Sequence, residues 1–169
     1  MFCLETRPGR DPAMSIDAGA VSLVGFDCHM STDRTTLVLG HPYAEGPPRW
    51  VTARELAGRW RESRHSGLDG IHGRFALVQE DSSSGTFTVV TYRFGGINIF
   101  RASIVDRLLV SDSVEEIAAR APCLHLDVGA LLEFLEIGHF LADGTHFEEV
   151  RRLKPATVST ITPGARIAT

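Results

Sequence analysis

The chain has 169 residues, enough for one domain with a sizeable hydrophobic core. Its residues are 43% hydrophobic and 22% charged, and the net charge of -4 comes from interspersed acids and bases, so composition does not predict a nucleic acid or an anionic membrane as partner. No apolar run resembles a signal peptide or approaches the roughly 18–20 residues of a membrane span, and we expect a cytoplasmic protein.

The cysteine and histidine patterns exclude the usual metal and disulfide motifs. Cys3, Cys28 and Cys123 are widely spaced, and no CxxC pair exists, so neither a zinc knuckle nor a disulfide framework is expected. This usage fits a reducing compartment. The seven histidines show no metal-ligand spacing, and we expect no metal site in the chain.

The first third of the chain predicts a tail, two strands and a helix. Residues 1–19 are polar and contain two prolines and two glycines, and we expect a loose tail there, with one domain over residues 20–169. Residues 20–27 and 35–41 are predicted strands, followed by prolines at 42, 47 and 48 that should exclude regular structure. Thr52 with Glu55 forms a capping box, which predicts a helix that stops near Gly67.

Two hairpins and two helices are predicted beyond this point. Residues 75–81 and 86–93 should pair around a serine-rich turn, and both faces of the second strand are largely apolar, which is typical of a strand covered on two sides. A second hairpin is expected over 97–103 and 107–113. The remaining expected elements are a short helix over 114–121, a helix capped by Asp127 that runs through 141, and a last strand over 156–163.

These elements predict an α+β fold. Strands occur in both halves of the chain, and strands that are apolar on both sides need a covering layer on each side. A four-layer αββα sandwich of two mostly antiparallel sheets, with helices outside, satisfies this requirement.

The order of short motifs resembles a known family. The hairpin is similar to the family stretch L-x-G-x-F-A-F-A-L-x-D, followed by R-D-x-F-G-x-x-P-L-Y, through Leu68, Gly70, Gly73, Phe75, Ala76, Leu77, Asp81, Arg93, Phe94, Gly95, Ile99 and Phe100. Further echoes are Val110, Ser111, Asp112, Glu116, Ile117 and Ala118. The strongest match runs through Leu126, Asp127, Ala130, Leu131, Phe134, Leu135, Gly138, Thr145, Phe147, Glu148, Val150, Arg152, Leu153, Pro155, Pro163 and Gly164.

Over about residues 35–165 the chain thus resembles the N-terminal, class II glutamine amidotransferase domain of asparagine synthetase-type enzymes. The resemblance implies a fold of the N-terminal-nucleophile (Ntn) hydrolase type. In that family the nucleophile is a cysteine at the mature N-terminus, and its own α-amino group serves as the base.

Several catalytic parts of the family are missing or altered here. The only cysteine near the start is Cys3, which follows Phe2. A bulky residue after Met1 normally prevents removal of the methionine, so Cys3 is expected to have an ordinary amide nitrogen and is only a weak candidate nucleophile. The family's oxyanion-hole Asn-Gly is matched by Leu39-Gly40, so Gly40 remains as a candidate substrate-binding residue without the side-chain donor. The R-G-P-D and G-S-D-x-E substrate loops are not found.

We therefore expect a degenerate, non-hydrolysing amidotransferase-like domain. The resemblance implies a scaffold or substrate-recognition platform for an ATP-binding synthetase domain, in cis or in trans, as in lasso-peptide cyclases and β-lactam synthetases. ATP and Mg²⁺ are expected only in that second domain, which would begin where this chain ends, and a peptide substrate is a further expected partner. Two alternatives remain open: an active glutaminase that supplies ammonia, and a free-standing peptide- or partner-binding module.

Overall fold

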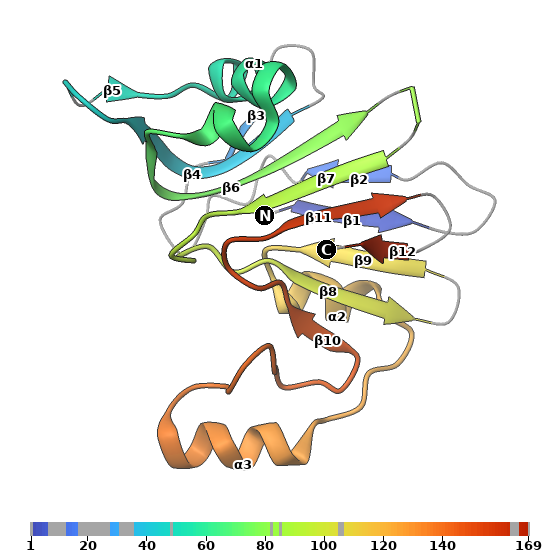
Figure 1. Cartoon of the computed structure of the whole chain (residues 1–169). Coiled ribbons are helices and arrows are strands. Elements are labelled where there is room, and N and C mark those ends of the chain that lie inside the picture. The colour runs from blue at the N-terminus through green and yellow to red at the C-terminus, as the bar shows by residue number, and fades with distance from the viewer. Residues whose placement is uncertain are drawn as a thin grey trace. The chain divides into compact units, whose positions relative to one another are not determined.

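The computed structural model describes residues 2–6, 13–16, 28–30, 36–47, 49–81, 83–84, 86–104, 107–162 and 166–168 (Figure 1). Its contacts divide the chain into two compact units. The first is built from residues 1–20, 98–154 and 163–166, and the second from residues 21–97, 155–162 and 167–169. Each unit is described by itself.

The first unit contains a five-stranded sheet in the order β10-β8-β9-β1-β2. Its elements are β1 (Phe2–Thr6), β2 (Ala13–Ile16), β8 (Phe100–Ile104), β9 (Arg107–Ser111), α2 (Val114–Arg120), α3 (Val128–Ile137) and β10 (Val150–Arg152). The helix α2 begins at Ser113, whose hydroxyl accepts the backbone N–H of Glu116, and it buries Ile117. Ile117 packs with Ala102, Leu109 and Val150 of the sheet, and this cluster forms the core of the unit.

The second unit contains the larger sheet, with seven strands in the order β12-β11-β7-β6-β4-β3 and β5 paired to β4. Its elements are β3 (Cys28–Met30), β4 (Thr36–Ala44), β5 (Arg49–Trp50), α1 (Ala53–Ser63), the 3₁₀ helix η1 (Arg64–Leu68), β6 (Ile71–Asp81), β7 (Thr86–Thr91) and β11 (Val158–Thr162), with β12 (Arg166–Ala168) at the sheet edge. The buried residues Leu56 and Trp60 of α1 pack on Leu77 of β6 and Val90 of β7. Each such apolar side chain stabilises the fold by about 1.5–3 kcal/mol.

The predicted α+β class with two antiparallel sheets is confirmed. All strand pairs for which the structure describes a register are antiparallel. Both predicted hairpins are present as β6–β7 and β8–β9. Burial on both faces of β7 is also confirmed, since Val89 and Val90, which point to opposite faces, are 0% and 5% exposed.

Some expectations about single segments were wrong. Residues 1–19 were expected to be a loose tail, but they contain β1 and β2, and β1 pairs with β9 in the sheet. The prolines and the glycine at positions 8, 9 and 12 fall between two short runs that are mostly apolar, FCLET and AMSI, and these runs form the strands. A further short strand, β12, follows the strand that we expected to be the last. The helix expected to run to residue 141 ends at Ile137, because Gly138 adopts φ 77° and terminates it. The predicted strand at 20–27 lies outside the described residues.

Pro42 does not end regular structure but lies within β4. It pairs with Gly73, and its carbonyl accepts the backbone N–H of Val51 at 2.9 Å. Gly40 (φ 84°) and Gly73 (φ 108°) make the ladder irregular here, which tolerates a residue without an N–H. A Cβ on Gly40 would lie 2.1 Å from the carbonyl oxygen of Arg74, and one on Gly73 would lie 2.2 Å from that of His41. The two strands approach so closely that both positions require glycine.

Candidate functional site

The two site candidates taken from the sequence lie in different units. Cys3 is in β1, where its backbone pairs with Ser15 of β2 and Ser111 of β9. Gly40 is in β4 of the second unit and pairs with Phe75 of β6.

The surroundings of Gly40 explain the glycine without a substrate. The space beside its Cα is occupied, since a Cβ there would also lie 2.6 Å from Cδ1 of Ile97. The preceding residue, Leu39, is 3% exposed and aliphatic, so its side chain donates no hydrogen bond. The backbone of this segment fits the sheet, and Leu39 offers no side-chain donor for the oxyanion hole that the sequence resemblance led us to expect at Gly40.

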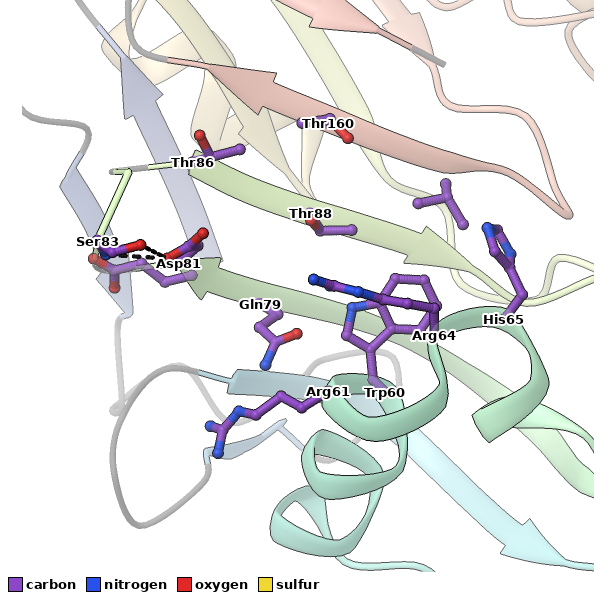
Figure 2. Close-up of a pocket in the computed structure, with 12 residues that line it drawn as sticks. Trp60, Arg61, Arg64, His65, Gln79, Asp81, Ser83, Thr86, Thr88 and Thr160 are labelled. Carbon is purple, nitrogen blue, oxygen red and sulfur yellow. Dashed lines mark hydrogen bonds between the residues drawn. The ribbon is translucent and has the colours of Figure 1, made fainter.

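A pocket that the sequence did not predict lies beside α1 in the second unit. It has a volume of about 790 Å³, which is within the usual range of ligand sites. Figure 2 shows its walls: the end of α1 and η1 on one side, and β6, β7 and β11 on the other. All of its lining residues belong to the second unit.

Strand register explains why the floor of this pocket is polar. Val158, Val90 and Leu77 lie side by side across β11, β7 and β6, and α1 packs on this apolar row. Two residues along each strand, on the same face, comes the row Thr160, Thr88 and Gln79. This polar row lines the pocket. The helix thus covers the apolar row, and the neighbouring polar row faces the pocket.

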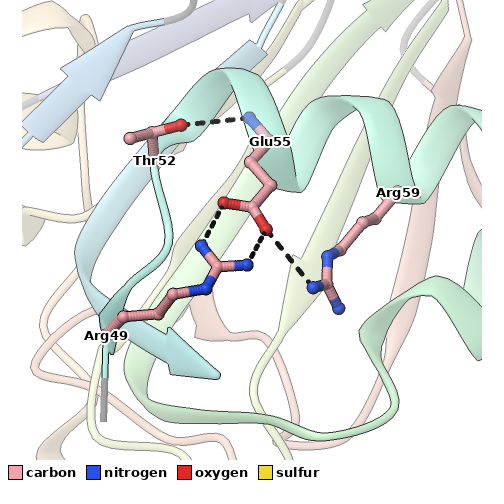
Figure 3. Close-up of polar contacts among 4 residues, drawn as sticks. All are labelled: Arg49, Thr52, Glu55 and Arg59. Carbon is pink, nitrogen blue, oxygen red and sulfur yellow. Dashed lines mark hydrogen bonds and ion pairs between the residues drawn. The ribbon is translucent and has the colours of Figure 1, made fainter. Parts of the chain in front are cut away.

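A polar cluster at its N-terminus holds α1 in place. The Thr52 hydroxyl caps the helix by accepting the N–H of Glu55 at 3.2 Å. The Glu55 carboxylate accepts two hydrogen bonds from Arg49 of β5, at 2.8 and 2.6 Å, and a third from Arg59 at 3.3 Å (Figure 3). The Arg49 hydrogen bonds lower the pKa of Glu55, and Glu55 raises the pKa of Arg49. This cluster joins β5 to the helix that carries one wall of the pocket.

Trp60 places an unpaired donor beside the pocket. The side chain is 2% exposed, and within the described residues its Nε1 has no hydrogen-bond partner. An unsatisfied buried N–H costs about 1–3 kcal/mol. Figure 2 shows the edge of the indole that carries this nitrogen on the same side as the Gln79 amide, and Gln79 is itself only 7% exposed. Both of these buried side chains line the pocket.

Basic side chains from the end of α1 and from η1 line the pocket. They are Arg61, Arg64 and His65. The Arg64 guanidinium lies 5.9 Å from the centre of the Trp60 ring, and the His65 ring contacts the same indole edge to face, with a centroid distance of 5.6 Å. Arg64 has φ 50°, a left-handed conformation at the junction between α1 and η1. This junction places Arg64 and His65 on either side of one tryptophan.

The hairpin end of the pocket is acidic. Asp81 accepts hydrogen bonds from the hydroxyl and the backbone N–H of Ser83, at 2.6 and 3.0 Å. These bonds, the hydroxyl first, lower the pKa of the Asp81 carboxyl, which is therefore an anion at neutral pH. Thr86, which pairs with Asp81 across the hairpin, adds a hydroxyl. The pocket thus has a cationic helix wall and one anionic end.

A smaller cavity of about 260 Å³ shares His65 and Val158 with this pocket. Its walls include Tyr92, Arg93 and Thr157. The Thr157 backbone N–H donates to the Thr91 hydroxyl at 3.1 Å, which closes this side of the sheet.

The described residues define neither a metal centre nor a membrane span. In this part of the chain, no three side chains of histidine, cysteine, aspartate or glutamate gather where they could hold a metal ion. None of the helices described is long and apolar enough to cross a bilayer.

Comparisons with known proteins do not place the chain in a family. A scan against protein-family models gives no match, and a search of the curated proteins gives no match either. The fold alone defines the class of the protein, which is α+β with two antiparallel sheets and has a polar pocket beside α1. The amidotransferase resemblance remains a prediction.

The sequence does not predict this pocket because its lining residues come from four separate elements, α1 with η1, β6, β7 and β11. One signal was present in the alternation Thr86, Thr88, Val90, which changes from polar to apolar along one face of β7. Such a change marks the point where a covering helix ends. Which arginines would lie above the polar row depends on the register of three strands and on the end of α1, and neither is encoded locally.

Proposed function

We propose that the chain is a non-hydrolysing, amidotransferase-like domain of an ATP-dependent, amide-forming enzyme of the asparagine synthetase type. It acts as scaffold and substrate-recognition platform for a separate ATP-binding synthetase domain, in cis or in trans. The resemblance over residues 35–165 motivates this proposal, and the exposed apolar surface of α3 is the observation that carries it.

The helix α3 exposes side chains that helices normally bury. Asp127 caps it by accepting the N–H of Ala130 at 3.0 Å, and Ala130 is its buried residue. Large apolar side chains around the rest of the helix are exposed, namely Val128 (64%), Leu132 (59%), Leu135 (79%) and Ile137 (47%). Leu126 and Leu141, on either side of the helix, are 57% and 50% exposed.

An apolar helix of this kind is usually covered by another protein surface. The helix lies in the segment with the strongest resemblance to the synthetase family, from Leu126 to Pro155. A synthetase domain is therefore the partner that we propose for this face. Glu133 and Glu136 on the same helix favour a partner surface with basic residues around an apolar centre.

The absence of hydrolysis is supported at two positions. Leu39 provides no donor where the family has an asparagine, and removing one such donor typically lowers turnover by about 10²–10³. Cys3 follows Phe2 in the sequence, so its nitrogen is an amide and not a base. ATP and Mg²⁺ belong to the partner domain in this proposal.

We place the protein in the cytoplasm. Cys123 is a free, exposed thiol, which fits a reducing compartment. Labelling with a membrane-impermeant maleimide, before and after cell lysis, tests this location: modification of intact cells would contradict it.

The experiment has a hydrolysis arm and a docking arm. The purified chain with glutamine should release no glutamate above the buffer rate. The DNA in frame with this chain and the adjoining genes should encode a domain with the S-G-G-x-D-S pyrophosphate loop, and that domain should co-purify with this chain.

Leu135→Glu should abolish this co-purification. Phe94→Glu is the matched control, since Phe94 is an equally exposed apolar residue (78%) in the second unit. Steady glutamate release, or co-purification that survives Leu135→Glu, would overturn the proposal.

One alternative has an observation of its own. A free-standing peptide-binding module is favoured by the pocket beside α1, which does not depend on a synthetase domain. The two functions differ in the docking arm, because a free-standing module remains monomeric and soluble with α3 uncovered.

A further inference from the structure

Among the described residues, the polar floor of the pocket beside α1 is open on one side. Thr160, Thr88 and Gln79 form a continuous polar row across three strands, and Gln79 is 7% exposed. The next residues along the hairpin are Thr86 and Asp81, which also line the pocket. Sheet residues buried to this degree normally find hydrogen-bond partners, so the floor is suited to a polar occupant.

Trp60 and Arg64 indicate the chemistry of the group that they would contact in the occupant. The buried Nε1–H of Trp60, which has no partner among the described residues, requires a hydrogen-bond acceptor. The Arg64 guanidinium lies 5.9 Å from the centre of the same indole ring. An acceptor that reaches both groups is best served by negative charge, because the guanidinium forms strong bonds with oxyanions.

The surrounding charge favours a singly charged anion over a phosphate. The C-terminal end of α1 borders the pocket, and the partial negative charge of a helix C-terminus disfavours a dianion. Asp81 adds a full negative charge at the hairpin end. A carboxylate beside Arg64 can accept hydrogen bonds from the guanidinium and from Trp60 Nε1–H. As a monoanion it is repelled less than a phosphate dianion by Asp81 and by the C-terminal end of α1.

The floor also indicates how the carboxylate is presented. Thr86 and Thr88 are two residues apart on one strand, so their side chains repeat about every 6.8 Å, which is also the repeat of an extended peptide. Hydroxyl and amide groups both donate and accept, as peptide N–H and C=O groups require. A cavity of about 790 Å³ holds several residues of such a peptide.

We propose that this pocket binds an extended peptide segment through an acidic side chain, whose carboxylate contacts Trp60 Nε1 and Arg64 while the peptide backbone lies along Thr86, Thr88, Thr160 and Gln79. The inference rests on the proposed function in one respect, because it identifies an acidic peptide as the ligand of the proposed substrate-recognition platform. The site itself lies wholly in the second unit and is independent of α3.

The test uses the full 169-residue chain with Trp50→Phe, which leaves Trp60 as its only tryptophan. The probes are two hexapeptide libraries, N-acetylated and C-amidated, that carry glutamate or glutamine at one fixed position and uncharged residues elsewhere. Trp60 fluorescence reports binding. The glutamate library should give a saturable change, and the glutamine library should bind at least tenfold more weakly.

Single substitutions then test which side chains of the pocket contact the peptide. Arg64→Gln should weaken binding of the best glutamate peptide at least tenfold. Arg93→Gln is the matched control, because Arg93 also lies over an aromatic ring, 4.8 Å from the centre of Phe94, but does not line this pocket. Thr88→Val should weaken the same peptide about threefold to tenfold. Thermal unfolding of each variant verifies that the fold is intact.

Four results would overturn the inference: no saturable change with either library, equal binding of the two libraries, equal loss with Arg64→Gln and Arg93→Gln, or tighter binding of inorganic phosphate than of the peptide. Equal affinity for free N-acetylglutamate would overturn the peptide assignment and identify a small carboxylate as the ligand. No synthetase domain is used, so failure here leaves the α3 docking test unaffected, and failure of docking leaves this one unaffected.

Discussion

The helices α1 and α3 have similar lengths and similar beginnings but opposite surroundings. Each starts at a residue whose side-chain oxygen accepts a backbone N–H, Thr52 for α1 and Asp127 for α3. The helix α1 buries Leu56 and Trp60 against its own sheet. In α3 the large apolar side chains are exposed, and Leu135 reaches 79%.

This difference distinguishes a helix that buries its apolar side chains within the chain, α1, from a helix whose apolar surface needs a partner, α3. The amphipathic sequence of α1 matches a sheet in the same unit, and the polar cluster around Glu55 fixes its orientation. The helix α3 forms for local reasons, a cap and a terminating glycine, and its apolar surface is not used by the described residues of the unit. Function is therefore expected at the open polar pocket beside α1 and at the apolar face of α3.

The largest expected difference between the two helices comes from truncating one leucine on each of them. Leu56→Ala should destabilise the protein by roughly 3–5 kcal/mol, because Leu56 is 0% exposed and its removal leaves a cavity. Leu135→Ala should change stability by less than about 0.5 kcal/mol. Urea unfolding followed by circular dichroism measures both. A cost above about 2 kcal/mol for Leu135→Ala would mean that α3 is packed within this chain, and the comparison would fail.

Two glycines sharpen the same contrast. Gly40, in the sheet under α1, and Gly138, at the end of α3, have φ values of 84° and 77°. A Cβ on Gly40 would clash with the carbonyl oxygen of Arg74, whereas a Cβ on Gly138 would have no other atom within 4 Å. Gly40→Ala should therefore cost about 2–3 kcal/mol from strain and overpacking together, and Gly138→Ala about 1 kcal/mol from strain alone. Equal losses in chemical unfolding would show that the contact with Arg74 is not restrictive.

The elements of this fold were predictable where the signal is local. The Thr52 cap, the hairpin of residues 75–91 and the α+β class follow from capping and alternation. The β1 strand was not predictable from its own short segment, because its partner β9 lies about a hundred residues away. Pro42 was misjudged for a related reason: only the close approach of β4 and β6 shows that the ladder is irregular there.

The candidate site was much less predictable than the fold. Cys3 and Gly40 were chosen through a resemblance, and Gly40 is explained by packing against Arg74 and Ile97. The polar row of Thr160, Thr88 and Gln79 exists only once three strands are in register. Trp60 is typical of a core residue in the sequence, and only the structure shows that its N–H lacks a partner within the part of the chain that is described.

Substitution of the N-cap residues, Thr52 for α1 and Asp127 for α3, compares the two helices at their N-termini. Thr52→Ala should cost about 1 kcal/mol, and the loss should extend to peptide binding in the pocket because α1 carries one wall. Asp127→Ala should have a similar effect on α3 stability, with no change in peptide affinity. Thermal unfolding and the Trp60 titration measure the two quantities separately. Weakened peptide binding in Asp127→Ala would contradict the independence of the two regions.

The smallest expected effect concerns the contact between His125 and Glu149, which we call the clamp; His125 lies just before α3 in the sequence. The His125 ring and backbone N–H both contact the Glu149 carboxylate, at 2.6 Å for Nδ1 and 3.0 Å for the backbone nitrogen. The neighbouring bridge between Leu126 and Phe147 depends on this loop. The Glu149 hydrogen bond raises the pKa of His125, and the His125 hydrogen bond lowers the pKa of Glu149.

These directions define the pH window in which the clamp stabilises α3. The His125 contribution is complete below the ordinary histidine pKa of 6.5 and is lost as pH rises through the raised value in the folded protein. The Glu149 contribution is present above the ordinary glutamate pKa of 4.5 and is lost as pH falls through the lowered folded value. Protection of the Asp127 and Glu148 amides against hydrogen exchange should therefore exceed that in His125→Gln most clearly between these two values. Both side chains are largely solvated, so the difference should be small and should decrease with added salt. A difference that grows above pH 8 would show that neutral histidine forms the contact, and α3 would then be held by an ordinary hydrogen bond.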